Sequence, residues 1–465
     1  RYLGNDYMPQ ASMDTTAVLA TCPELEERIE SQPDQNWQLR SALQVSSFVA
    51  AIGLASAVWF FAHTGVVHAI DSPTYIEPAI GLASGRGFVT LAGSPETLRT
   101  PGFPLLIAAF LRGGAGMAAL ITFQHLLRIV VAVATAWATL RLTGSRLEAI
   151  AAGGILCLDL ASLESAASIL TENLFTTMMA GAALCMYRAV DRPDSRAAVI
   201  LSGLLAGATA LVRPVNLFFA IAGAAFLLLA RRDRTGGRAA VMFTIACASV
   251  PIAWTARNYV ETGYATFSSI SGVDMLHRAA GTLAIEERGS YQDNQAREYL
   301  RLEKQACLAL SAAEPCATIA IEKRSAYFSR FSSSVIREHP VQYLKTVIAG
   351  AGAMMLGGDR GRLSELTGIP AASAMRILIG YGVTLLLLAG ISAAAWWRRN
   401  PRFFFLAAVV IGYLLFISAG AGSYSRMRVP IMPLYSMLIA SGSVSLFGRF
   451  RFKWNDASSG KLEAS

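Results

Sequence analysis

The sequence predicts an all-α membrane protein built from about ten transmembrane helices. Of its 465 residues, 54% are hydrophobic and only 15% are charged, whereas about a quarter of the residues are charged in a soluble domain. The mean hydropathy is +0.45. The net charge of +9 lies in small arginine clusters between apolar segments, as topology signals do in membrane proteins. Nucleic acid is therefore not expected as a partner.

Ten apolar stretches approach the roughly 20 residues that a helix needs to cross a bilayer. They comprise residues 42–62, 115–139, 147–163, 166–187, 197–212, 214–230, 238–256, 374–397, 403–421 and 430–447. Two other apolar stretches, residues 101–111 and 346–358, are shorter. These two are expected to lie in the membrane interface or to enter it only partway.

The arginine and lysine clusters predict the topology, because cytoplasmic loops carry the excess of positive charge. The clusters fall on one side of the membrane if ten helices cross and both termini lie inside. The loop 63–114 and the region 257–373 then lie on the outer face. The expected organisation is a mobile cytoplasmic tail (1–40), an N-terminal transmembrane module (41–256) with the outer loop 63–114, an outer region with an interfacial helix (257–373), C-terminal transmembrane helices (374–447) and a basic cytoplasmic tail (448–465).

The first outer loop carries a carboxylate and a cation between apolar spans. Asp71 precedes Ser-Pro, and Pro73 suits the first position of a helix whose cap is Asp71 or Ser72. Apolar residues recur after it at helical spacing, which places Asp71 and Tyr75 near the start of this helix. The functional alternative to capping is a general base that accepts the proton of an incoming hydroxyl. Arg99 suits either a phosphate or lipid headgroups.

Further arginines depart from the positive-inside pattern. Arg257 ends the seventh span, Arg213 lies between the fifth and sixth spans, and Arg426 and Arg428 precede the last span. Several such exceptions on the outer face suggest an anionic ligand. Arg426 and Arg428 are two residues apart, so they reach one ligand only from an extended segment, and the alternative is that one serves a structural carboxylate. Glu172 either joins two helices or lines a cavity.

Cysteine and histidine residues leave two questions open. Cys307 and Cys316 lie nine residues apart in the longest polar loop. They form a disulfide if that loop faces an oxidising compartment, and two free thiols fit equally well. The five histidines show no ligand spacing, and Asp274-x-x-His277 alone does not make a metal site. No cofactor is assigned, and a divalent metal stays open.

In their order along the chain, these motifs resemble the multi-pass GT-C glycosyltransferases. The nearest pattern is that of the dolichyl-phosphate-mannose protein mannosyltransferase-like and lipid A aminoarabinose transferase group. The resemblance covers residues 42–447, and the order and placement of the motifs carry it. The motifs are Asp71-x-x-x-Tyr75, Gly85-x-Gly-Phe88, Arg99-Thr-Pro-Gly-Phe-Pro104, Glu172-Asn-Leu, Arg213-Pro214, Trp254-x-x-Arg257-Asn-Tyr259, His339-Pro-x-x-Tyr343-Leu344 and Arg426-x-Arg428-x-Pro430-x-x-Pro433.

The resemblance implies a GT-C type bundle that transfers a sugar from a polyprenyl-phosphate donor to a lipid-linked or glycan acceptor. The reaction is expected at the outer, periplasmic face of the cytoplasmic (inner) membrane, among membrane lipids. Asp71 is followed by Ser72, where many protein mannosyltransferases carry Glu, which argues against a protein acceptor. The roles implied are Asp71 as the base, Arg257, Arg99, Arg428 and Arg426 as ligands of the donor phosphate, and Tyr75, Glu172, Arg213, Asn258, Tyr259 and His277 as cavity lining.

Two other classes of protein remain as alternatives. The first is a transporter or flippase of lipid-linked sugars, in which paired half-repeats with broken helices are common, and none is evident here. The second is an O-antigen polymerase or ligase, which shares a large late outer loop but not the early loop around Asp71. The sequence does not determine the sugar, the acceptor or the anomeric outcome.

Overall fold

The structure is a computed structural model that describes residues 35–192, 194–231, 234–311 and 315–444. The described residues form the α-helices α3 to α19 and short 3-10 helices, and no strand occurs among them. The predicted all-α fold class is therefore confirmed. Most of the predicted tail 1–40 and all of the tail 448–465 lie outside the described residues.

Among the described residues, five helices are long and apolar enough to cross a membrane, judged by length and composition. A sixth span results if the bent pair α7 (Arg146–Leu158) and α8 (Leu160–Ala167) counts as one. Three further apolar helices in the described residues are shorter, namely α5 (Gly102–Arg112), α10 (Arg196–Val212) and α11 (Phe219–Ala230). The count of ten crossings thus stays a prediction. The five long helices are α3 (Gln35–Thr64), α6 (Met117–Thr143), α12 (Arg234–Thr262), α18 (Ala371–Arg399) and α19 (Pro401–Ser418).

The predicted span 147–163 is not one straight helix. The chain bends by 50° between α7 and α8, because the backbone of Asp159 adopts an extended conformation (φ −63°, ψ 119°). The side chain of Asp159 then accepts a hydrogen bond from the Ser162 amide at 2.9 Å and so caps α8. The expectation of an uninterrupted helix is therefore wrong at this point.

The apolar core lies where α9 (Glu172–Asp191), α10, α11, α12 and α19 pack together. Large side chains such as Phe175, Phe219 and Phe243 are fully buried in it. Glycine permits the close contact of α10 with α12, since a Cβ atom built on Gly207 would lie 2.3 Å from the Cys247 carbonyl oxygen. This compact core holds the helix ends that carry the charged residues described below.

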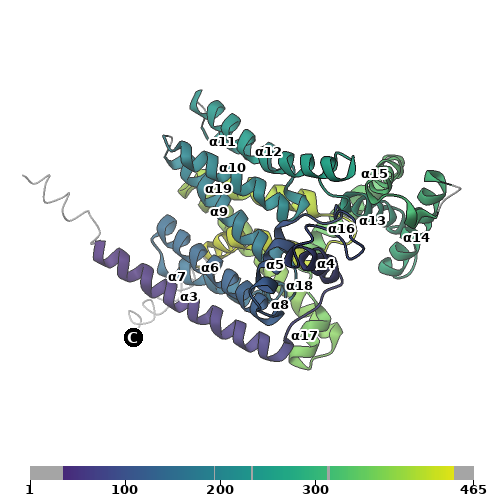
Figure 1. The fold of residues 1–465 in the computed structure, drawn as a ribbon. Coiled ribbons are helices and arrows are strands. Elements are labelled where there is room, and N and C mark those ends of the chain that lie inside the picture. Colours follow the sequence, from purple (N-terminus) through teal and green to yellow (C-terminus); the bar gives the residue numbers. More distant parts are fainter. Residues whose placement is uncertain (1–34, 193, 232–233, 312–314, 445–465) are drawn as a thin grey trace, which may run out of the picture.

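Six further helices of the described residues lie at one end of the bundle, which we call the loop end. In Figure 1, α13, α14 and α15 lie together at the right of the molecule, with the segment around α4 next to them. The two predicted outer elements meet there, because the Ser269 amide donates to the Thr97 carbonyl at 2.7 Å and Thr97 Oγ1 donates to Glu322 at 2.6 Å. The helices of the loop end not yet named are α4 (Ser72–Ala83), α13 (Ile270–Ala284), α14 (Tyr291–Leu310), α15 (Ile321–Glu338), α16 (Pro340–Leu356) and α17 (Arg360–Thr367).

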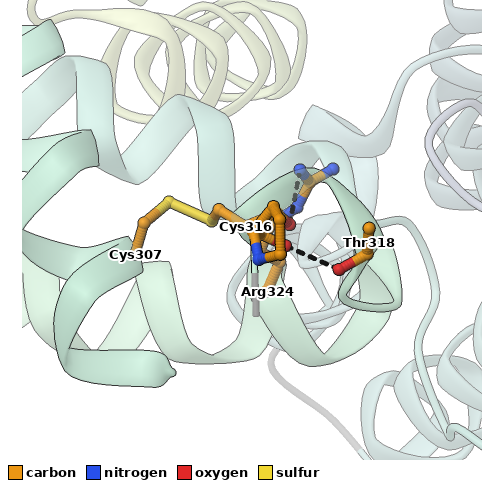
Figure 2. The surroundings of a disulfide bond; sticks show 5 residues. Cys307, Cys316, Thr318 and Arg324 are labelled. Atoms are coloured by element: carbon orange, nitrogen blue, oxygen red, sulfur yellow. Dashed lines mark hydrogen bonds between the residues drawn. A yellow bond between two sulfur atoms is a disulfide. The ribbon is translucent and has the colours of Figure 1, made fainter. Parts of the chain in front are cut away.

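Cys307 and Cys316 form a disulfide, so the first of the two alternatives for this pair holds. Figure 2 shows the bond between the end of α14 and the turn that leads to α15. In that turn, Thr318 donates to the Pro315 carbonyl at 2.7 Å, and Arg324 of α15 donates to the Cys316 carbonyl at 3.3 Å. The disulfide therefore fixes the connection between two helices of the loop end.

Candidate functional site

Both carboxylate oxygens of Asp71 are held by arginines from distant parts of the chain. Arg99 Nη2 lies 3.0 Å from Oδ1, and Arg426 Nη2 lies 3.1 Å from Oδ2. The side chain of Asp71 keeps 30% of its surface exposed, whereas those of Arg99 and Arg426 keep 14% and 15%. Asp71 is therefore the most accessible member of a partly buried ion-pair network.

Glu172 extends this network into the bundle. Its carboxylate accepts a 2.6 Å hydrogen bond from Arg213 Nη1, and Arg426 Nε lies 3.0 Å from the same oxygen as an ion pair. Glu172 is almost fully buried, and its second oxygen has no hydrogen-bond partner among the described residues. Arg426 thus connects Asp71 to Glu172. We call Asp71, Arg99, Glu172, Arg213 and Arg426 the arginine–carboxylate network.

The network carries a formal charge of +1, from three guanidinium groups and two carboxylates. An excess of cation in a partly buried position attracts an anion, because the surrounding protein screens charge less than water does. Burial disfavours the ionised form of Asp71, but Arg99 and Arg426 outweigh burial and hold the pKa of this carboxyl below its usual 3.8. Asp71 is consequently ionised at neutral pH.

The backbone around Asp71 explains why its side chain is free to face the arginines. Asp71 stands at the N-cap of α4, one of the two predicted cap positions, but its side chain makes no capping hydrogen bond. Ser72 instead accepts a bond from the Ala69 amide at 2.9 Å and donates to the Ile169 carbonyl at 3.1 Å. Thr74 donates to the Asp71 carbonyl at 2.7 Å, which fixes the first turn of the helix.

Arg99 is positioned from several sides. Its Nε donates to Thr74 Oγ1 at 2.8 Å, and its guanidinium lies 4.6 Å from the ring centre of Tyr75, a cation–π geometry. The carboxylate of Glu96 accepts hydrogen bonds from the backbone amides of Leu98 and Arg99, so the turn before Arg99 is fixed as well. Tyr75 is buried beneath this arginine, and burial raises the pKa of its phenol.

Arg428 contacts a different carboxylate from Arg426. The two residues belong to the 3-10 helix η3 (Ser425–Ile431), so their side chains diverge. Arg428 Nη2 lies 2.8 Å from Asp159 Oδ1 in a pair that is almost wholly buried. Its Nη1 donates to the carbonyls of Met355 and Gly357 at 3.1 and 3.2 Å. The structure thus shows the second alternative for this arginine pair, in which one member holds a structural carboxylate.

Arg257 holds the loop 63–114 against the end of α12. Its guanidinium donates to the carbonyls of Phe88 at 3.2 Å and Glu96 at 3.4 Å, and it lies 5.0 Å from the ring centre of Trp254. Gly87, at φ +92°, makes the turn that brings Phe88 to this position, in a conformation that favours glycine. Arg257 reaches the network through the 96–99 turn, without a contact to Asp71 among the described residues.

The remaining predicted lining residues occupy varied positions. Asn258 is buried and donates to the carbonyls of Thr266 and Phe267 at 2.9 and 3.3 Å, so it shapes the turn after α12. Tyr259 is 58% exposed on the surface of α12. His277 lies on α13 and stacks on Tyr299 with ring centres 4.2 Å apart. Among the described residues, no group of three or more His, Cys, Asp or Glu side chains is arranged to hold a metal ion.

Three polar residues at the site were not among the predicted ones. Thr74 joins Asp71 to Arg99 through its hydroxyl. The ring centre of Tyr424 lies 4.9 Å from the guanidinium carbon of Arg426. Burial raises the pKa of Tyr424 to about 12. Asp274 on α13 lies within electrostatic range of Arg99 and Asp71. Thr74 and Tyr424 stand in the same motifs as Asp71 and Arg426, and this adjacency is the signal that would have identified them.

The fold and the site together define a helical, multi-pass membrane protein with an anion-attracting network at its loop end. A family model described as dolichyl-phosphate-mannose-protein mannosyltransferase matches residues 98–254. No curated protein matches the chain significantly.

Solved structures with a similar fold are also found. The archaeal oligosaccharyltransferase AglB from Archaeoglobus fulgidus, in complex with an inhibitory peptide and a dolichol-phosphate, superposes with a TM-score of 0.52 at 12% identity, over 92% of this chain and 52% of AglB. The chain thus spans about half the length of AglB. ArnT from Cupriavidus metallidurans gives TM-scores of 0.39 in the apo state (14% identity, 85% of this chain, 76% of ArnT) and 0.38 bound to undecaprenyl phosphate (13%, 86% and 78%). Residues 98–254 are thus similar to the mannosyltransferase family, and the chain shares its helical fold with AglB.

Proposed function

We propose that this protein transfers a sugar from a polyprenyl-phosphate donor to a lipid-linked or glycan acceptor. The observation that carries the proposal is the double ion pair of Asp71 with Arg99 and Arg426. It places a carboxylate that can take a proton beside guanidinium groups that can hold a phosphate. The family match and the fold support the same class of reaction.

In the proposed reaction, the acceptor hydroxyl attacks the anomeric carbon of the donor sugar. The new bond joins the acceptor oxygen to this carbon, and the bond from the carbon to the phosphate oxygen breaks. Asp71 takes the hydroxyl proton, and the polyprenyl phosphate leaves with the electron pair. Arg99 and Arg426 stabilise the charge that develops on the phosphate, and this electrostatic stabilisation is often the largest single contribution to catalysis.

Donor binding also activates the base in this proposal. Without a donor, the two arginines hold the pKa of Asp71 low, which makes the carboxylate a weak base. A donor phosphate competes with Asp71 for Arg99 and Arg426, because phosphate oxygens accept the same paired hydrogen bonds. Release from the arginines raises the pKa of Asp71 and strengthens it as a base. Proton removal is thereby delayed until the donor is bound.

Among the arginines, the proposal assigns donor phosphate binding to Arg99 and Arg426 first. Arg428 is 1% exposed and already holds Asp159. We therefore assign it a structural role, which is to hold η3 in position. Arg257 contributes to donor binding from the edge of the site, either by a contact to the phosphate or by holding the loop that carries Phe88 and Glu96. Tyr75 supports Arg99 through its ring, and Glu172, itself held by Arg213, supports Arg426.

We further propose that the loop end faces the outer, periplasmic side of the cytoplasmic membrane. The disulfide between Cys307 and Cys316 supports this orientation, because disulfides persist in oxidising compartments and are rare in the cytosol. In Figure 1, α14 lies at the same end of the bundle as α4, whose N-cap is Asp71. Thiol labelling of intact cells under reducing and non-reducing conditions tests this orientation.

The direct test uses the purified protein in liposomes with candidate polyprenyl-phosphate sugars and membrane-lipid acceptors. The wild type is expected to transfer the sugar, and Asp71→Asn is expected to abolish transfer while it retains donor binding. Asp293→Asn, an exposed carboxylate on α14, is the matched control and should retain full activity. Equal turnover by Asp71→Asn would reject the assigned base, and lipid translocation without transfer would favour a flippase.

A further inference from the structure

The carboxylate of Asp274 on α13 is not held by any basic side chain among the described residues. It forms no hydrogen bond and no ion pair with any residue in the described part of the chain. Asp71, Glu172 and Asp159 by contrast are each held by at least one arginine. A carboxylate that protein groups do not satisfy retains its full capacity to accept hydrogen bonds.

The packing of α13 directs Asp274 toward the site. The residues just before this helix are held by the turn that carries Arg99, since Ser268 donates to the Leu98 carbonyl at 2.7 Å. Arg278 donates to the carbonyls of Ile417 and Ala419 at 2.7 and 2.9 Å, close in the chain to Arg426. Residues four apart share one face of a helix. Asp274 therefore lies on the face between the Arg99 turn and the segment before η3.

The surroundings of Asp274 agree with this direction. Its side chain is open to solvent, and yet the protein around it raises the pKa of its carboxyl by burial. The exposure and the raised pKa are both expected for a side chain that solvent reaches from one side while protein surrounds it on the others. The charged groups within electrostatic range are Arg278, Arg99, Arg213 and Asp71, three of which belong to the arginine–carboxylate network.

We propose that Asp274 contacts the sugar of the donor and accepts hydrogen bonds from its hydroxyl or amino groups. This inference rests on the proposed function. It names a specificity-determining residue that acts on the sugar, whereas Arg99 and Arg426 act on the phosphate.

The chemistry of the donor separates these two tasks. A carboxylate repels a phosphate, so Asp274 cannot share the ligand atoms of the arginines. The sugar is attached directly to the phosphate, and it presents hydroxyl donors where the phosphate presents only acceptors. A carboxylate opposite an arginine pair therefore suits a ligand in which a phosphate is adjacent to groups that donate hydrogen bonds. A hydrogen bond to a charged acceptor is worth roughly tenfold in affinity or more.

The experiment compares two probes, undecaprenyl phosphate and undecaprenyl phosphate bearing a single hexose, by calorimetric titration of the full chain in detergent. The measured quantity is the ratio of the two dissociation constants, bare carrier over sugar-bearing carrier. We expect a ratio above one for the wild type, a ratio about tenfold smaller for Asp274→Asn, and the wild-type ratio for the control Asp293→Asn. Bare carrier should bind Asp274→Asn at least as tightly as it binds the wild type, because a nearby negative charge is removed.

The outcomes separate this inference from the proposed function. If the wild type binds neither carrier, the proposed function fails. If it binds both carriers but the ratio is one, or is unchanged in Asp274→Asn, Asp274 does not contact the sugar and the inference is overturned. Weaker binding of bare carrier to Asp274→Asn would likewise overturn it and assign the residue a structural role. Asp274→Glu, which keeps the charge but lengthens the side chain, should lower the ratio without weakening bare-carrier binding.

Discussion

Asp71 and Arg426 form an ion pair with Nη2 3.1 Å from Oδ2, although 355 residues separate them in the chain. The pair joins the start of α4 to the 3-10 helix η3. Arg426 also pairs with Glu172 inside the bundle, where its Nε lies 3.0 Å from Oε1. One guanidinium therefore couples a solvent-accessible carboxylate to a buried one, and this coupling is the basis of the proposed site.

Removal of the proposed base is expected to lower activity far more than stability. Asp71→Asn should reduce turnover by roughly 10²- to 10⁴-fold, the range for a general base, because an amide cannot take the acceptor proton. Donor affinity should be retained or should rise, since Arg99 and Arg426 lose a competing anion. Transfer assays together with donor titration check this prediction, and a variant with normal turnover would contradict it.

The two arginines of η3 are expected to behave differently. Arg428→Met removes one partner of a buried pair with Asp159, which typically costs about 3 to 5 kcal/mol, so thermal unfolding should shift strongly. Arg426→Ala should lower donor affinity, with a smaller loss of stability because its side chain is partly exposed. Thermal melts and donor titrations of both variants provide the measurement. Equal effects of the two substitutions on donor affinity would contradict the division of roles.

Arg257→Ala is expected to weaken donor binding by about tenfold, the effect of one lost charge-assisted contact. The structure adds a second readout, because Arg257 holds the carbonyls of Phe88 and Glu96. Hydrogen exchange of residues 86–97 should accelerate in the variant. Unchanged donor affinity with accelerated exchange would assign Arg257 to the loop alone, and Arg112→Ala on α5 is the control.

The pH dependence of stability should reveal the state of Asp71. Its pKa in the folded protein lies below the usual 3.8, so its ion pairs stabilise the protein above this pH and are lost as the pH falls through the folded pKa. The difference in melting temperature between wild type and Asp71→Asn should therefore be constant above about pH 4 and shrink below it. A difference that already shrinks near pH 6 would contradict the depressed pKa.

Loss of the disulfide is expected to loosen the loop end. Cys307→Ser opens a loop closed across nine residues, for which the chain-entropy estimate is roughly 2 to 3 kcal/mol. Faster hydrogen exchange should then appear in α14 and α15, while the core around α9 and α10 keeps its protection. Cys185→Ser, at a free thiol, is the control. Mass spectrometry of the unreduced wild type tests whether the bond itself is present.

Much of the fold could be predicted from the sequence, because helices depend on local properties. The length of an apolar stretch predicted the long helices α3, α6, α12, α18 and α19. The break at Asp159 was not predicted, since the residues around it are as apolar as those of a continuous span. What favours the break is the bond of Asp159 to Arg428, which lies 269 residues further along the chain.

The sequence by itself determined the helical class and the set of charged residues at the helix ends, since composition and periodicity are properties of neighbours in the chain. Only the tertiary structure decided which cation meets which carboxylate. Arg426 and Arg428 look equivalent in the sequence, yet one contacts Asp71 and Glu172 and the other contacts Asp159. The cause is that the energy of an ion pair depends on distance in space, which the packing of remote helices sets and local residue patterns do not encode.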